Sequence, residues 1–350
     1  MPWTKIAADK KHRHAADSHD TGVRRGSYRE AILEATESCM ETDKSLFVLG
    51  EGVDDTGGVF GTTKGLIDIF GPERVIDTPL AENGITGIAM GAALAGMRPL
   101  LVHMRVDFLP LSLDQIANHA AKWSYMFGGN VSVPLTIRAI TGRGWGSAAQ
   151  HSQSLQAVFA HFPGLKVVMP ATPYDAKGLL ISSLYDNNPV LFLEHRWLYD
   201  MRGPLPAEMY RVPIGKANLI REGKDVTIVA ISQMVGMAME AAEVLKEEDI
   251  ECEVIDLRTI KPLDTDLIRS SLQKTGRLVV ADTAWKEFGV SAEILALALE
   301  DSATFSALKG PAVRVALPDV PTPASHVLEE VFYPGPADIM GAVKKALNEA

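Results

Sequence analysis

The chain has 350 residues, of which 47% are hydrophobic, and it carries a formal net charge of −10. This length allows two domains of about 100–200 residues each, and the acidic balance argues against nucleic acid as the main partner. No apolar run reaches the ~18–20 residues that a membrane span needs, and two distant cysteines without metal-ligand spacing favour a reducing cytoplasm over a disulfide framework or a zinc site.

The first 26 residues are polar and mixed in charge, and they lack the apolar core of a signal peptide. This composition predicts a flexible, solvated arm over residues 1–26. Three histidines in it, His12, His14 and His19, leave a metal-binding tract open as an alternative.

Buried strands alternate with helices over the next 170 residues. Residues 46–50, 74–78, 98–104, 134–141, 165–170 and 190–195 have strand patterns, and residues 28–41, 62–70, 111–126, 152–162 and 173–186 have helical ones. A further helix, rich in small residues, begins at Glu82. This alternation predicts a parallel sheet covered by helices on both faces. We therefore expect a first domain over residues 27–200.

The helix that begins at Glu82 contains four glycines within thirteen positions, at 84, 87, 91 and 96. Glycine in a helix interior costs about 1 kcal/mol relative to alanine. The pattern predicts that another backbone packs closely against this helix.

A segment with several prolines and mixed polarity, residues 201–222, reads as a linker. Beyond it, residues 225–231, 252–257, 277–282 and 313–317 have strand patterns, and residues 234–246, 265–273, 290–299 and 337–347 have helical ones. The sequence therefore predicts an α/β protein of two doubly wound domains, the second over residues 223–350.

Common nucleotide and hydrolase motifs are absent from the sequence. There is no phosphate-binding loop that ends in Lys-Ser/Thr, no GxGxxG between a strand and a helix, and no GxSxG elbow. Nucleotide phosphate binding and serine hydrolysis therefore lose support.

Four lone side chains follow the ends of predicted strands: Glu51, Glu82, Phe108 and His151. The carboxyl ends of parallel strands share one edge of a sheet, where α/β proteins bind ligands, so we expect the four to converge. Each also has a structural interpretation. Glu82 is equally consistent with a first-turn carboxylate that stabilises the helix dipole, Glu51 with a solvated loop acid, Phe108 with a core aromatic, and His151 with a cap or core histidine.

Several strings of the chain resemble the β subunit of the thiamine-diphosphate-dependent first component of 2-oxo acid dehydrogenase complexes, a transketolase-like family with pyruvate, branched-chain and acetoin dehydrogenase members. The strings are IDTPLAENGITGIAMGAALAGMRP, DQIANHAAK, AAQHSQS, HFPGLKVVMPATPYDAKGLL, DNNPV, EFGVSAEI and LPDVPTP. The resemblance implies a pyrimidine-binding domain followed by a transketolase C-terminal domain. It also implies an α subunit, in an α₂β₂ assembly, that holds the diphosphate and Mg²⁺, because the Gly-Asp-Gly…Asn-Asn motif for them is absent here.

The resemblance also implies roles for the four side chains. Glu82 is the acid beside the aminopyrimidine nitrogen of thiamine, which drives the tautomer that deprotonates the thiazolium carbon. Phe108 stacks on the pyrimidine ring, and Glu51 is a second acid in a proton path between two active sites. His151 stabilises or protonates the intermediate, and Met104 lines the cofactor pocket.

Three further residues have weaker assignments. Asp186 and Asn188 match a loop that binds K⁺ in some relatives, although a plain turn explains them almost as well. Arg143 lies where relatives carry small residues, and we expect it to contact a polar or anionic substrate group; a surface loop charge is the alternative.

The function that the resemblance implies is decarboxylation of a 2-oxo acid and transfer of the acyl group to a lipoyl carrier protein. The two distant cysteines place the protein in the cytoplasm. Two alternatives stay open. One is a two-subunit transketolase-like enzyme that transfers a two-carbon or acyl unit to a sugar or a biosynthetic carrier. The other is a scaffold subunit without catalytic activity, against which the intact set of Glu82, Phe108 and His151 argues.

Overall fold

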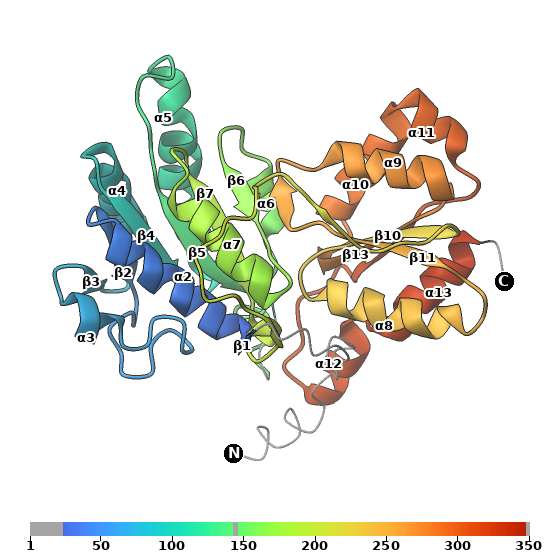
Figure 1. Ribbon diagram of the computed structural model, residues 1–350, viewed down its shortest axis with the longest axis horizontal. Coiled ribbons are helices and arrows are strands. Elements are labelled where there is room, and N and C mark those ends of the chain that lie inside the picture. The colour runs from blue at the N-terminus through green and yellow to red at the C-terminus, as the bar shows by residue number, and fades with distance from the viewer. Residues whose placement is uncertain (1–23, 143–145, 348–350) are drawn as a thin grey trace.

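The computed structural model describes residues 24–142 and 146–347. They form two α/β halves that lie side by side, the first in blue to green and the second in yellow to red (Figure 1). Each half has a central sheet with helices on both faces, as the alternation of strand and helix patterns predicts.

The first sheet has seven strands in the order β12-β6-β7-β5-β4-β2-β3. All neighbours pair in parallel except β12, which is antiparallel to β6. Every residue of β2, β5 and β7 is buried, as expected for strands covered on both faces. The strands are β2 (Leu46–Gly50), β3 (Val75–Asp77), β4 (Arg98–His103), β5 (Thr136–Thr141), β6 (Lys166–Val168), β7 (Val190–His195) and β12 (Thr259–Lys261).

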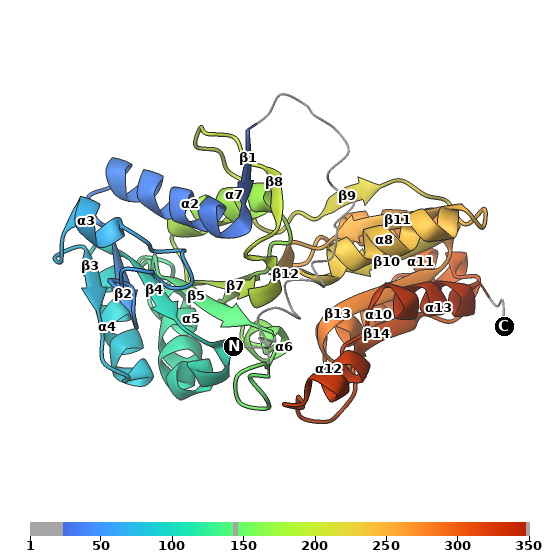
Figure 2. The same cartoon turned by 90° about the horizontal axis from the view of Figure 1, so that it is seen from below.

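Helices α2 (Tyr28–Thr42) and α7 (Pro173–Leu184) lie side by side on one face of this sheet (Figure 2). Helix α2 begins with a capping box, in which the backbone N–H of Ser27 donates to the Glu30 carboxylate at 2.6 Å. The other helical segments of this half are α3 (Leu66–Phe70), α4 (Glu82–Leu94), α5 (Ala121–Met126), α6 (Gln156–Ala160) and the short turns η2 (Val106–Ser112), η3 (Asp114–Ala120) and η4 (Arg196–Leu198).

Three predicted helices differ from the structure. The expected helix over 111–126 is divided into the 3₁₀ turn η2, the π-helical turn η3 and α5. The expected helices over 62–70 and 152–162 shrink to α3 and α6. In these two segments, polar residues at the expected start form hydrogen bonds outside the helix. The Thr62 hydroxyl donates to the Val59 carbonyl (2.6 Å), and the Ser154 hydroxyl bonds to the Thr141 hydroxyl (3.3 Å).

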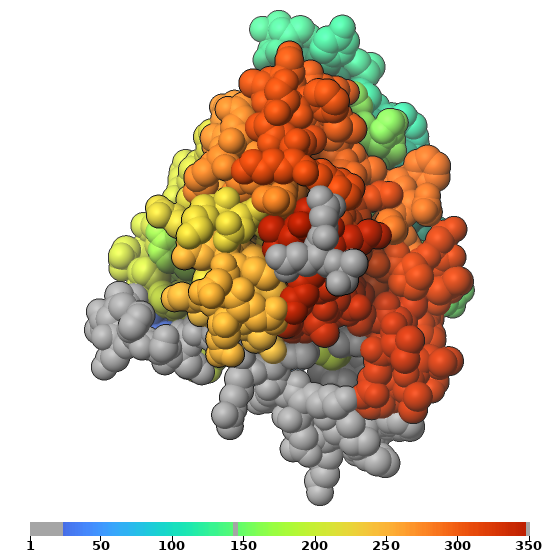
Figure 3. Space-filling model, turned by 90° about the vertical axis from the view of Figure 1, so that its right-hand side faces the viewer, coloured from blue at the N-terminus to red at the C-terminus, as the bar shows by residue number. Residues whose placement is uncertain are grey.

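The second sheet has five strands in the order β14-β13-β10-β11-β9, with only β9 antiparallel. The strands are β9 (Asn218–Arg221), β10 (Val226–Ala230), β11 (Cys252–Asp256), β13 (Leu278–Trp285) and β14 (Val313–Leu317). The helices are α8 (Met234–Lys246), α9 (Thr265–Thr275), α10 (Val290–Glu300), α11 (Ser302–Ala307), α12 (His326–Phe332) and α13 (Pro336–Ala346). Figure 3 faces this half, with α8 in yellow-orange beside α13 in red.

Several short strands connect parts of the chain that are far apart in sequence. Strand β1 (Arg25–Ser27) pairs with β8 (Arg202–Pro204), and β12 leaves the second half to complete the first sheet. The segment expected to be a linker, residues 201–222, thus contains β8 and β9.

A buried acidic cluster lies where the two halves meet. Arg258 forms an ion pair with Asp175 of α7 at 2.6 Å, and its backbone N–H donates to Asp256 at 3.1 Å. Burial, and then the charge of Asp175, raise the pKa of Asp256 to about 8. Two carboxyl groups thus face one guanidinium, and the arrangement favours a proton on Asp256 at neutral pH.

This cluster predicts a pH dependence of stability. An acid with a raised pKa in the folded protein stabilises it below the unfolded pKa of about 3.9, and that contribution is lost as the pH rises through about 8. We expect Asp256→Asn to flatten the fall in unfolding free energy between pH 5 and pH 8.5 in urea titrations. Asp266→Asn, at an exposed site on α9, is the control, and an equal slope in wild type and Asp256→Asn would contradict the assignment.

Candidate active site

Four adjacent strands end at the same edge of the first sheet. Strands β5, β4, β2 and β3 are neighbours in that order, and all of them are parallel. Glu51 follows β2 directly and Glu82 is the first residue of α4, which follows β3. Phe108 lies in η2 after β4, and His151 lies in the segment after β5. The structure therefore brings all four side chains to the expected edge.

Glu51 and Glu82 lie near each other at this edge. Both are half-buried. Burial raises the pKa of Glu51, and the negative charges of Glu82 and Asp77 add to that effect. The Asp77 carboxylate also accepts a hydrogen bond from the Gly52 N–H at 2.7 Å. The surroundings of Glu51 therefore favour retention of a proton on that carboxyl group.

Polar groups that the sequence did not single out connect Glu82 to the turn that carries Phe108. The Thr86 hydroxyl donates to the Glu82 carbonyl oxygen at 2.7 Å and bonds to the Ser112 hydroxyl of η2 at 2.9 Å. The Nε2 atom of His103 lies 3.4 Å from the Thr86 hydroxyl. Burial lowers the pKa of His103 to about 4. The spacing of Thr86, one helical turn after Glu82, was the available signal in the sequence.

Phe108 and His151 are in contact. Their ring centroids lie 5.2 Å apart with an angle of 74° between the planes, which is an edge-to-face arrangement. The Phe108 side chain is 37% exposed, so it is not the fully buried core aromatic of the alternative interpretation. Part of its ring stays accessible to a ligand.

A glycine begins the segment between β5 and His151. Gly142 has φ +77°, and a Cβ atom there would lie 2.1 Å from Nε2 of His195. Both the backbone conformation and the space require glycine. This close approach fixes the direction in which the chain leaves β5 toward His151.

The other predicted residues lie elsewhere or outside the described part of the chain. Met104, at the exit of β4, is half-buried and packs against the core under α2 and α7. Arg143 lies outside the described residues, as do the three histidines of the N-terminal arm.

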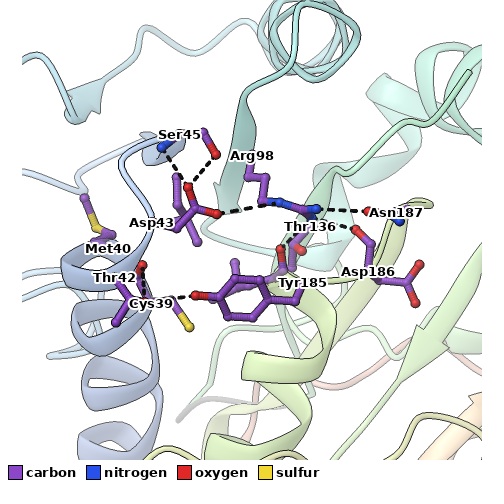
Figure 4. A network of polar contacts seen from close by, with 12 residues as sticks. Cys39, Met40, Thr42, Asp43, Ser45, Arg98, Thr136, Tyr185, Asp186 and Asn187 are labelled. Atoms are coloured by element: carbon purple, nitrogen blue, oxygen red, sulfur yellow. Dashed lines mark hydrogen bonds and ion pairs between the residues drawn. The ribbon is translucent and has the colours of Figure 1, made fainter.

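Asp186 and Asn188 precede the amino end of β7, on the side of the sheet opposite to the carboxyl ends of the strands. Figure 4 shows the network of polar contacts around Asp186. The Asp186 carboxylate pairs with Lys166 and accepts the Asn188 N–H at 2.8 Å. Its backbone carbonyl accepts from Arg98 at 3.0 Å, and Arg98 also donates to Asn187 at 2.9 Å. Both carboxylate oxygens of Asp186 thus have a partner within the described chain, and the K⁺ site stays a prediction.

The small-residue helix α4 leaves much of its surface open. In the described chain, a Cβ atom added at Gly84 or Gly91 would meet nothing within 4 Å, and one at Gly87 would lie 3.4 Å from the Gln115 side chain. Ile88, on the same helix, is 61% exposed. Among residues 24–142 and 146–347, no backbone makes the expected close approach to Gly84 or Gly91.

Comparison with known proteins gives matches over nearly the whole chain. Residues 25–201 match the transketolase pyrimidine-binding domain, and residues 215–339 match the transketolase C-terminal domain. The β subunit of acetoin:2,6-dichlorophenolindophenol oxidoreductase from Cupriavidus necator is 46% identical, over 93% of this chain and 98% of that protein. The mitochondrial pyruvate dehydrogenase E1 component subunit β of Bos taurus is 47% identical, over 91% of this chain and 90% of that protein.

A solved structure described as a split-gene transketolase, inactive β₄ tetramer, superimposes with a TM-score of 0.72 at 24% identity. It covers 92% of this chain and 99% of its own. At this identity the likeness concerns the fold, and it confirms the predicted pair of α/β units.

Proposed function

The chain belongs, as its sequence predicts, to the transketolase-like family of pyruvate and acetoin dehydrogenase β subunits, and we propose that it forms half of the active site of a thiamine-diphosphate-dependent 2-oxo acid dehydrogenase. The observation that carries the proposal is the meeting of Glu51, Glu82, Phe108 and His151 at one edge of the first sheet. A half-buried acid pair and an accessible aromatic ring fit the pyrimidine end of the cofactor, which needs a proton donor at a ring nitrogen and a flat apolar surface.

Thiamine diphosphate, when bound, supplies an acidic ring carbon that attacks the 2-oxo carbon and an electron sink for the loss of carbon dioxide. Glu82, which is half-buried, holds a proton at the aminopyrimidine nitrogen. Phe108 packs against the pyrimidine ring and orients it. Glu51 acts as a second acid in a proton path between two active sites, and Met104 lines the cofactor pocket.

His151 is exposed to solvent and contacts the Phe108 ring. We assign it a proton donor role toward the substrate-derived oxygen. Arg143 precedes it by eight residues in the chain, and we propose that it contacts a polar or anionic group of the substrate.

An α subunit completes this active site. We propose an α₂β₂ assembly in which the α subunit holds the diphosphate and Mg²⁺, because the sequence lacks the Gly-Asp-Gly…Asn-Asn motif for them. The open glycine positions of α4 support a closely packed subunit interface there. A K⁺ role for Asp186 and Asn188 stays a prediction that would require the Lys166 pair to open.

We propose that the acyl group passes to a lipoyl acyltransferase and that the protein acts in the cytoplasm. Cys39 and Cys252 are buried free thiols, which suits a reducing compartment. Within residues 24–142 and 146–347, no helix has the length and apolar character to cross a membrane.

The proposal is tested by co-expressing the chain with an α-subunit partner and assaying the purified assembly against a panel of 2-oxo acids and acetoin with an artificial electron acceptor. We expect turnover that depends on added thiamine diphosphate, with neither chain active alone. Transfer of a two-carbon unit to aldose acceptors, without oxidation of any 2-oxo acid, would favour the transketolase-like alternative. A fully assembled, cofactor-loaded complex inactive in both assays would favour the scaffold alternative.

A further inference from the structure

We propose that Asp107 and Arg105 are positioning residues that hold the His151 segment against Phe108. The inference rests on the proposed function, since it concerns the same edge of the sheet. These two charged side chains connect the end of β4 to the segment after β5.

The first contact is made by Asp107, which directly precedes Phe108. Its Oδ1 atom accepts the backbone N–H of Gln153 at 3.0 Å, and Gln153 follows His151 by two residues. The two aromatic rings meet 5.2 Å apart between these anchor points. The hydrogen bond therefore joins the residue before Phe108 to the residue two after His151, close in the chain to the contact between the two rings.

The second contact is made by Arg105, which donates to the Gly142 carbonyl at 3.1 Å. The Gly142 N–H in turn donates to the Gln153 carbonyl at 3.0 Å, and the Thr141 hydroxyl donates to that carbonyl at 3.1 Å. The start and the end of the segment after β5 are thus tied to each other and to the exit of β4. Neither anchor bond involves the catalytic side chains themselves.

The burial of the clamp, defined as Arg105 and Asp107, suits a positioning role. Burial raises the pKa of Asp107, while its bonds to Gln153 and the charge of Arg105 act in the opposite direction. The other carboxylate oxygen, Oδ2, is buried without a hydrogen-bond partner among the described residues. A buried carboxylate oxygen without a hydrogen bond destabilises the fold. We therefore infer that the Asp107 side chain is retained because it positions Phe108 and His151.

The backbone beside His151 is also constrained. Ala148 has φ +59°, a conformation that an alanine keeps only when its surroundings impose it. Its carbonyl accepts the His151 N–H at 3.4 Å. Loss of the Asp107 bond would therefore release a strained turn and let His151 move relative to Phe108.

The test uses the assembled α/β enzyme with Asp107→Ala, Asp107→Asn and the control Asp68→Asn, a matched change at an exposed site on α3. Misplacing a catalytic group by about 1 Å costs on the order of 100-fold in rate. We expect Asp107→Ala to lower kcat by about 10- to 100-fold, with the cofactor Kd and the substrate KM within about twofold of wild type. Asp107→Asn keeps an acceptor for the Gln153 N–H and should recover most of kcat.

A double-mutant cycle separates positioning from general loss of structure. If Asp107 acts through His151, Asp107→Ala should lower kcat no further in a His151→Ala background. Additive losses in that cycle, or a wild-type kcat in Asp107→Ala, would overturn the proposal. Should Asp107→Ala fail to assemble, the same cycle with Arg105→Ala decides the question.

Amide hydrogen exchange gives a readout that does not depend on turnover. We expect the Gln153 amide to exchange faster in Asp107→Ala than in wild type or Asp107→Asn, and an unchanged rate would count against the clamp. Failure of the clamp leaves the wild-type assembly active. Failure of the proposed function leaves it inactive toward 2-oxo acids while the exchange result still holds.

Discussion

Replacing Glu82 with Gln is expected to lower kcat of the assembled enzyme by about 10²- to 10⁴-fold, the usual contribution of a positioned acid or base. Gln keeps the length and a hydrogen-bonding amide but cannot exchange a proton with the aminopyrimidine nitrogen. The change leaves the fold of the chain intact because the Glu82 carbonyl, not its side chain, bonds to Thr86. Steady-state rates with an artificial electron acceptor measure the effect.

Two controls make this result interpretable. The cofactor Kd should rise by less than the factor by which kcat falls, because Phe108 still packs against the ring. Thr86→Val, which removes the bonds to Glu82 and Ser112 without removing the acid, should have a smaller effect than Glu82→Gln. Full activity of Glu82→Gln would remove the central catalytic assignment and would favour the scaffold alternative.

The second large effect concerns a buried ion pair between two neighbouring strands of the first sheet. The Nε atom of Arg138 on β5 donates to Glu194 on β7 at 2.6 Å, and both side chains are fully buried. Arg138 also donates to the Thr62 hydroxyl at 2.8 Å, and the Tyr199 hydroxyl donates to Glu194 at 3.0 Å. Removing one partner of such a pair leaves an unpaired buried charge and costs about 3–5 kcal/mol.

We therefore expect Glu194→Ala to lower the unfolding free energy by about 3–5 kcal/mol, measured by urea titration of the purified chain or assembly. The matched control is Glu251→Ala, which breaks an exposed pair with Lys224 at 3.4 Å and should cost about 0–1 kcal/mol. The double variant Arg138→Met/Glu194→Leu should recover much of the loss, because apolar side chains replace both charges. A cost below that of the control would contradict the assignment.

The strand and helix alternation predicted the fold class because parallel strands that are buried on both faces have continuous apolar runs, as in residues 46–50. It did not predict β9 or β12, since three- or four-residue antiparallel edge strands have no periodicity that a sequence could show. The 3₁₀ and π turns after β4 were likewise hidden, because Leu109, Ile116 and Ala120 keep a helix-like apolar spacing whichever turn is formed.

The convergence of Glu51, Glu82, Phe108 and His151 followed from the rule that parallel strand ends share an edge. The bonds through Thr86, Ser112 and Asp107 could not be predicted, since they depend on side-chain positions across elements far apart in the chain. The glycines of the helix that begins at Glu82 predicted a close backbone neighbour. Within the described chain this prediction is wrong, because a Cβ atom added at Gly84, Gly91 or Gly96 would meet nothing within 4 Å.

The strand β12 has a consequence for how the protein is made. It covers the outer edge of β6, and it is translated some ninety residues after that strand, at positions 259–261. During synthesis, β6 is an unpaired edge strand of the first sheet until β12 has been translated. Unpaired edge strands can pair with those of other nascent chains. A polypeptide terminated near residue 200 would carry this unpaired edge permanently and should be prone to aggregate.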